Sequence, residues 1–164
     1  MSLIVGVPGI PAPQGSFRPM VNKYTGKPVL VAGAQSGYLR YRADIRTAAQ
    51  VAMREQGYTI LSGAVGLYVA FTFPRPDSHW LPVNSRRDAP ALKPGAPQWL
   101  TSSPDVDKLC RAVLDALTGI AYLDDAQVTA ICGTKVYSDE WGQPGFTAIA
   151  VTHEPVIEAS GVTH

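Results

Sequence analysis

Residues 64–73 carry the pattern that most constrains the fold, because large apolar side chains alternate with smaller ones along the whole segment. The large positions are Val65, Leu67, Val69, Phe71 and Phe73. Alternation at every second residue predicts a β-strand that buries one face. Pro74 follows directly and ends the strand. The chain is therefore expected to build a sheet whose apolar face is covered by other elements.

Two segments show helical periodicity. Residues 41–56 form an amphipathic pattern that Gly57 ends. A second pattern runs from about Asp107 to Gly119, which stands where a C-terminal cap belongs. Further alternating segments are predicted as strands, the last two as a terminal hairpin: 2–7, 127–137 and 146–153. The expected fold is α/β of the α+β type, a mixed, largely antiparallel sheet of about five strands packed against two main helices.

The chain of 164 residues is expected to be a single domain, 1–164, with long loops at 9–38 and 74–103 and a frayed tail after 154. Its hydrophobic share of 46% suits a compact protein. No apolar run reaches transmembrane length and no signal-like segment opens the chain, so no membrane partner is expected. Cys110 and Cys132 are too few for a disulfide framework, which favours a cytoplasmic location.

Carboxylates are concentrated between residues 103 and 128. This stretch holds five of the thirteen acidic residues: Asp105, Asp107, Asp115, Asp124 and Asp125. In an extended segment Asp105 and Asp107 share one side, and a hairpin-like return could bring the later pair to them. Grouped carboxylates repel one another unless a cation is bound, and hard oxygen ligands suit magnesium or manganese. The alternative is structural: an N-cap at Asp107, a surface ion pair at Arg111 and a turn at 124–125.

The order of short motifs in this stretch points to a family. PDVDKL, LDALTG and LDDAQV resemble, block by block, the signature of the RusA-type Holliday junction resolvases, which are small metal-dependent endodeoxyribonucleases. Lys108 departs from the pattern where the family often has asparagine, and Arg111 where it has a lysine. The resemblance implies one or two Mg²⁺ ions, or Mn²⁺ as a substitute, held by Asp105, Asp107 and Asp125. It also implies that Asp124 supports or bridges the ions and that Arg111 offsets developing negative charge.

The implied activity is structure-selective cleavage of four-way (Holliday) DNA junctions by paired phosphodiester hydrolysis, in recombination and repair. The implied partners are branched DNA and a second copy of the chain, because paired cuts on opposed strands suit a two-fold homodimer. Two other functions stay open. One is a nuclease for flaps or forks with the same metal chemistry. The other is a junction-binding protein whose chemistry Lys108 and Arg111 have weakened.

Charge is divided unevenly along the chain, although the net charge is only +1. Residues 10–56 contain seven basic side chains against two acidic ones, and residues from 104 onward contain three against nine. This division could form a phosphate-binding surface beside a metal site, or it could be uneven solvated charge. The candidate DNA-contacting residues are Arg18, Lys23, Lys27, Arg86, Arg87 and Trp99. Trp99, like Trp80, could instead pack against the core.

Overall fold

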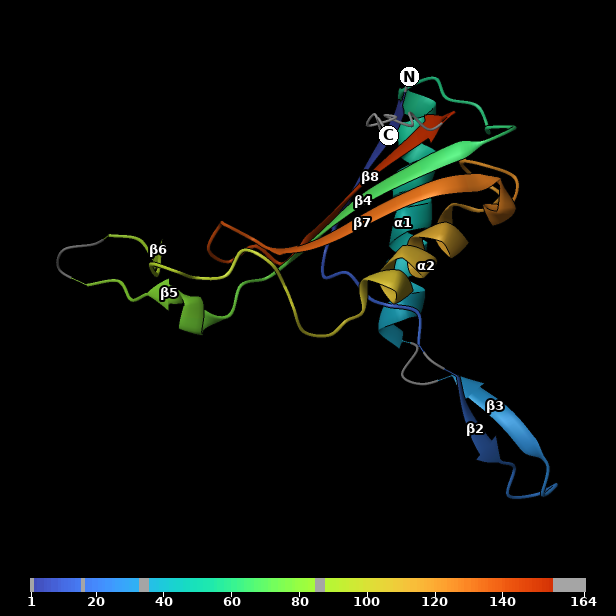
Figure 1. The fold of residues 1–164 in the computed structure, drawn as a ribbon, viewed down its shortest axis with the longest axis horizontal. Helices are drawn as coiled ribbons and strands as arrows, with labels where there is room; N and C mark the ends of the chain where they lie inside the picture. The colour runs from blue at the N-terminus through green and yellow to red at the C-terminus, as the bar shows by residue number, and fades with distance from the viewer. Residues whose placement is uncertain (1, 16, 33–35, 85–87, 155–164) are drawn as a thin grey trace, which may run out of the picture.

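A four-stranded sheet with two helices on one face forms the centre of the computed structural model (Figure 1). Residues 2–15, 17–32, 36–84 and 88–154 are described, with 17–20, 28–32 and 36 described for the backbone only. The strands are β1 (Ser2–Pro8), β4 (Val65–Phe73), β7 (Val128–Tyr137) and β8 (Phe146–His153), and the helices are α1 (Ser36–Glu55) and α2 (Val106–Leu117). The predicted α+β class, with a mixed sheet and two main helices, is confirmed.

The hydrophobic core lies between the helices and the sheet. Every second residue of β1 is buried, and so are the five alternating apolar residues of β4 that the sequence singled out. The two helices add buried side chains at helical spacing: Tyr41, Ile45 and Ala49 from α1, and Leu109, Val113 and Leu117 from α2. The buried faces of the strands and of the helices thus form one apolar layer.

The strands follow the order β1-β8-β4-β7, with β8 antiparallel to both its neighbours and β7 parallel to β4. The predicted terminal hairpin of β7 and β8 is therefore wrong, because β4 lies between them. Alternating hydrophobicity predicts that a segment is a strand, but it does not predict which strand pairs with it. A parallel pair needs a long crossover, and the chain between β4 and β7 supplies one that contains α2. The crossover carries the acidic stretch onto the face of the sheet that the helices cover.

The element boundaries otherwise lie close to the predicted ones. The main difference is at α1, which begins at Ser36 rather than at 41 and ends before Gly57, whose φ of 67° suits the end of a helix. The tail after 154, predicted to be frayed, lies outside the described residues. Within the described part of the chain, neither helix is both long and apolar enough to cross a membrane.

Two extended segments project from this body (Figure 1). The first loop contains the hairpin of β2 (Phe17–Val21) and β3 (Pro28–Ala32). The second contains the short turn η1 (Asp77–His79) and the paired strands β5 (Trp80–Leu81) and β6 (Ala91–Leu92). Arg75 anchors the second segment where it leaves and returns, because its guanidinium donates to the carbonyl oxygens of Ser138 and Pro97, at 2.8 and 2.6 Å.

The returning chain runs along the outer edge of β7. Leu100 N–H donates to the carbonyl of Lys135 at 3.3 Å, and Tyr137 N–H donates to the carbonyl of Gln98 at 2.9 Å. Trp99 pairs with Val136 as an antiparallel bridge between these bonds. Residues 98–100 therefore act as a short extra edge to the sheet and lead directly to the start of α2.

Candidate active site

Asp105 stands at the N-cap of α2, but its carboxylate makes no hydrogen bond to the helix backbone. It pairs instead with Lys108, whose Nζ lies 2.9 Å from Oδ2. The hydrogen bond and charge of Lys108 lower the pKa of Asp105, and Asp105 in turn raises the pKa of Lys108. Asp105 is thus an exposed, ionised carboxylate whose oxygens do not cap the helix.

Asp107 lies inside the first turn of α2, so two expectations about it are wrong. It is not the N-cap, and it does not share a side with Asp105 in an extended segment. Consecutive helical residues are rotated by about 100°, so residues two apart point in different directions. Asp107 and Arg111, four residues apart, lie on the same face of the helix, and both are exposed.

A tight turn positions Asp124 and Asp125. The 3-10 helix η2 (Asp125–Gln127) begins with a reciprocal cap: Asp124 Oδ1 accepts from Ala126 N–H at 2.8 Å, and Gln127 Oε1 accepts from Asp124 N–H at 3.0 Å. The amide nitrogen of Gln127 ties the turn to the carbonyls of Leu61 and Gly63, at 3.1 and 3.0 Å. One carboxylate oxygen of Asp124 is therefore engaged in the turn.

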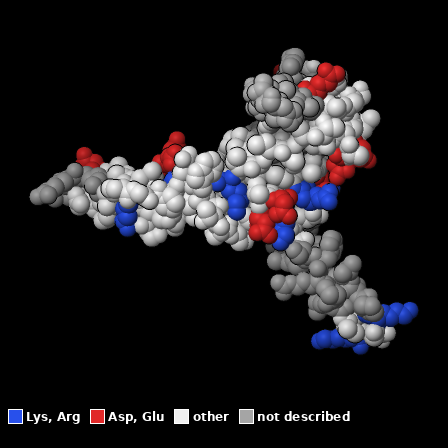
Figure 2. Space-filling view, viewed as in Figure 1, with Lys and Arg blue, Asp and Glu red and all other residues white. Residues whose placement is uncertain are grey.

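Arg111 joins the two acidic segments. Its Nη1 lies 3.4 Å from Oδ2 of Asp125, so the second acidic segment returns to the face of α2 that carries Asp107 and Arg111. Figure 2 shows acidic and basic side chains adjoining over this part of the body. The predicted approach of the two segments is present, although it follows the 3-10 turn rather than a β-hairpin.

The donor set suits a hard divalent cation, but the described residues are not gathered into a closed site. No group of three acidic, histidine or cysteine side chains among them lies close enough to hold a metal ion. Asp105 and Asp125 each face a cation, Lys108 and Arg111 respectively. Exposed carboxylates with room for water are the ligands that Mg²⁺ prefers, and binding one here would require both ion pairs to open.

Two arginines of the basic stretch 10–56 bond to backbone atoms of α2. Arg42 and Arg46 donate to the carbonyls of Asp115 and Ala116 near the C-terminal end of α2, at 3.3 and 3.2 Å. Tyr38 donates to the Asp115 carboxylate at 3.1 Å. Cations at a helix C-terminus satisfy its free carbonyls and oppose its dipole. Both arginines are half-buried, which this pairing explains.

The basic residues among the DNA-contacting candidates fall into three groups. Lys23 and Lys27 are exposed at the tip of the β2–β3 hairpin, where Figure 2 shows basic side chains. Arg18 lies on β2 with only its backbone described, and Arg86 and Arg87 lie outside the described residues. The chain entering the hairpin passes the acidic segment, because Gln14 N–H donates to the carbonyl of Lys108 at 3.2 Å. Gln14, three residues before β2, therefore lies beside the first turn of α2.

Trp80 and Trp99 differ in exposure. Trp99 is 55% exposed, and Trp80 is 7% exposed and stacks edge-on against Trp141, with ring centroids 5.3 Å apart. Trp80 is therefore buried within the β5–β6 segment, outside the main core cluster, and Trp99 is not buried at all. Trp99 offers an exposed aromatic face six residues before Asp105.

Two residues that position the site had no structural role assigned to them from the sequence. Gln127 anchors the second acidic segment through both its side-chain atoms, and Lys135 on β7 donates to the carbonyls of Ser102 and Pro104, just before Asp105. A glutamine beside two aspartates could have suggested a capping box. A lysine within an alternating strand looks like any solvated charge, so only the tertiary structure reveals the role of Lys135.

Comparison with known proteins agrees with this geometry. The family described as Endodeoxyribonuclease RusA matches residues 10–144, which include both extended segments, α2 and the two acidic segments. A protein of Bacillus subtilis (strain 168), described as uncharacterized protein YqaN, is 33% identical over 132 residues, which cover 80% of this chain and 85% of that protein. The chain belongs to the RusA family of endodeoxyribonucleases.

Proposed function

We propose that this protein is a Mg²⁺-dependent endonuclease that resolves four-way DNA junctions. The observation that carries the proposal is the contact between Arg111 and Asp125, at 3.4 Å. It brings the second acidic segment to α2, which has Asp105 at its N-cap and Asp107 in its first turn. Two of the blocks that resemble a RusA-type endodeoxyribonuclease therefore lie on or against α2, PDVDKL at its start and LDDAQV beside Arg111.

In this proposal Asp105, Asp107 and Asp125 hold the metal, which when bound lowers the pKa of a water molecule and stabilises charge on the phosphate. Lys108 and Arg111 form ion pairs with two of these carboxylates, Asp105 and Asp125. Arg111 stays charged at any working pH and cannot transfer protons. Released from Asp125, its planar group can face phosphate oxygens and stabilise the negative charge that develops during cleavage.

The β2–β3 hairpin is the proposed DNA-binding arm. Lys23 and Lys27 at its tip are exposed, and Gln14, which precedes the hairpin, donates to the carbonyl of Lys108. Such an arm can reach phosphates away from the scissile bond, as Arg18, Arg86 and Arg87 are also proposed to do. Trp99, exposed near the start of α2, is proposed to stack on unpaired bases where the junction opens.

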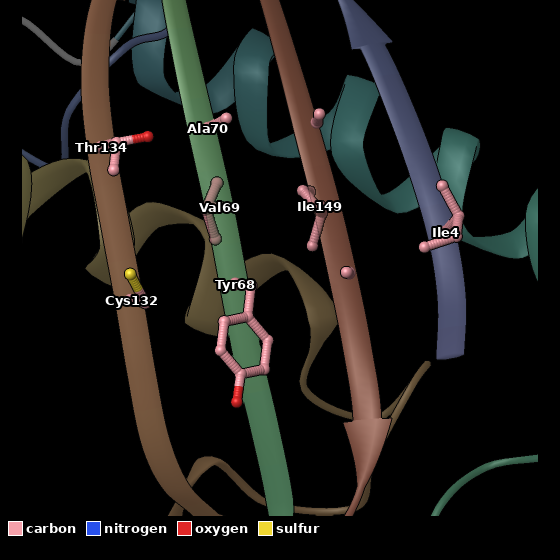
Figure 3. Close-up of a pocket in the computed structure, with 9 residues that line it drawn as sticks. Ile4, Tyr68, Val69, Ala70, Cys132, Thr134 and Ile149 are labelled. Atoms are coloured by element: carbon pink, nitrogen blue, oxygen red, sulfur yellow. The ribbon is translucent and has the colours of Figure 1, made fainter. Parts of the chain in front are cut away.

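A homodimer would supply two such sites, and the open face of the sheet offers a surface for it. This face contains an open cavity of about 320 Å³. Apolar or small side chains from all four strands line it: Ile4, Tyr68, Ala70, Cys132, Thr134, Ala148 and Ala150 (Figure 3). None of them carries a formal charge at neutral pH. The helices lie behind the sheet in this view, and Ile4, Tyr68 and Cys132 are exposed on the open face.

The edges of the sheet are less suited to a second copy. Gln56 bonds both the N–H and the carbonyl of Ile4 on β1, at 3.1 and 2.6 Å, and residues 98–100 run along β7. We therefore propose that two copies pack their open faces together as a two-fold sandwich. Ile4→Lys should give a folded monomer by light scattering. Val51→Lys, at an exposed apolar residue of α1, should leave the dimer intact. Equal behaviour of the two variants would refute this interface.

A cleavage assay on synthetic four-way, flap, fork and linear DNA, with Mg²⁺ or with a chelator, tests the function. The proposal expects paired cuts in the four-way junction that need Mg²⁺ and leave linear duplex intact. Preference for flaps or forks would favour the related nuclease. Tight junction binding without cleavage would favour the weakened binding protein. Linear DNA cut as fast as the junction would overturn the proposal.

A further inference from the structure

Lys135 ties the loop before α2 to the sheet. It lies on β7, half-buried, and its ammonium group donates to the carbonyl oxygens of Ser102 and Pro104, at 2.8 and 2.6 Å. Its own carbonyl accepts from Leu100 N–H at 3.3 Å. One residue of the sheet thus holds residues 100–104 through both its backbone and its side chain.

This tie bears directly on Asp105. The carbonyl of Pro104 belongs to the peptide unit whose nitrogen is that of Asp105, so fixing that carbonyl restrains the backbone from which the carboxylate projects. No capping bond from the Asp105 side chain to the helix does this instead. The other partner of the carboxylate is Lys108, a flexible and partly exposed side chain that a metal would displace.

A cation serves here for a physical reason. An ammonium group offers three donors and a full charge, so it can hold two carbonyl oxygens at once with charge-assisted bonds. Both carbonyls lie in a partly exposed loop, where water can replace a lost donor. Removing the charge should therefore loosen the loop more than it destabilises the fold.

We propose that Lys135 is a positioning residue for the metal site and holds Asp105 in the place where it can act as a ligand. The inference rests on the proposed role of Asp105. It concerns a residue on β7, a strand at the edge of the four-stranded sheet, that lies outside both acidic segments and bonds the backbone just before Asp105.

The test compares Lys135→Met, Lys135→Gln and Lys135→Arg with the natural protein. The neutral variants should raise the Mg²⁺ concentration for half-maximal junction cleavage by about tenfold or more, within the range of about 10–100-fold typical of residues that orient metal ligands. Arginine can also bond two carbonyls, so it should restore much of the affinity. Calorimetric titration with Mn²⁺ alone, without DNA, should show the same order of affinities.

Lys93→Met is the matched control. Its ammonium bonds a loop carbonyl in the same way, that of Ser78 at 2.7 Å, but in the β5–β6 segment. It should leave the dependence on Mg²⁺ unchanged. If the Lys135 variants lower only the melting temperature and keep the natural metal affinity, the inference is wrong while the nuclease proposal stands. If the natural protein shows neither Mn²⁺ binding nor metal-dependent cleavage, the proposed function itself has failed.

Discussion

Gly133 on β7 faces α2 at the turn that leads to the candidate active site. A Cβ atom built there would overlap the sulfur of Cys110 and lie 3.2 Å from Cγ2 of Val106. Cys110 is only 8% exposed, so the sulfur has little room to move. Gly133→Ala must therefore push the start of α2 away from the sheet or force Cys110 from its position.

Overpacking of this kind costs about 1–3 kcal/mol. For a chain of this size each kcal/mol shifts the melting temperature by about 2–4 °C, so Gly133→Ala should lower it by about 2–12 °C. Because α2 carries Asp105, Asp107 and Arg111, the same displacement should slow cleavage even at temperatures where the variant is folded.

A double-mutant cycle isolates the cause. Cys110→Ala removes the overlapping sulfur, and in the double variant the new methyl group at 133 fills part of its space. The two substitutions should compensate each other by at least about 1 kcal/mol in urea unfolding, and cleavage should recover. Additive losses of stability, or a Gly133→Ala variant as stable as the natural protein, would refute the proposed contact.

Three further predictions concern charge. Arg111→Ala should raise the activation free energy of single-turnover cleavage by about 2.7–4 kcal/mol, and Arg111→Lys should keep most of the rate. If the alanine variant instead loses only about 0.2–0.5 kcal/mol of folding stability, the arginine is a surface ion-pair partner. Replacing Lys23 and Lys27 by alanine should reduce the log–log salt dependence of junction binding by roughly one unit per lost contact, and an unchanged slope would remove the hairpin from the DNA-binding surface. Burial raises the pKa of Cys110 to about 11, so its contribution to stability is complete below the unfolded value of about 8.5 and is lost as pH rises toward 11. Urea unfolding at pH 8 and 10.5 should therefore show a larger loss for the natural protein than for Cys110→Ala, and parallel losses would contradict this.

Local patterns predicted much of the fold. The alternation along β4 and the helical spacing along α2 are properties of a few neighbouring residues, so they can be read without knowing what each element contacts. Gly119, predicted to cap α2, has a φ of 75°, a conformation that glycine adopts readily. The weaker pattern of α1 left its start uncertain by one to two turns.

Long-range pairing could not be predicted in the same way. The neighbour of β7 depends on the whole crossover, and the sequence favoured the simpler hairpin with β8. Arg42 and Arg46 looked like solvated charges because their acceptors, the last carbonyls of α2, are backbone atoms about 70 residues away. The role of Lys135 could not be predicted for the same reason, because its acceptors are also backbone carbonyls.

The acidic stretch was recognised from its residue types, but its geometry needed the structure. The extended arrangement expected for Asp105 and Asp107 is wrong because α2 begins at Val106. The approach of Asp125 to the helix was expected, and it depends on the capped turn held by Gln127. The assignment of these carboxylates as metal ligands remains a prediction.

The most direct test of that assignment is single-turnover cleavage of a four-way junction in Mg²⁺ by Asp105→Asn, Asp107→Asn and Asp125→Asn. Each change removes a charged ligand and nearly preserves shape, so each should abolish cleavage while junction binding survives. Asp44→Asn, which removes the same charge from an exposed position of α1, is the control and should cleave normally. Near-natural turnover by any of the three would show that its carboxylate does not hold the metal, and turnover by all three would contradict the proposed active site.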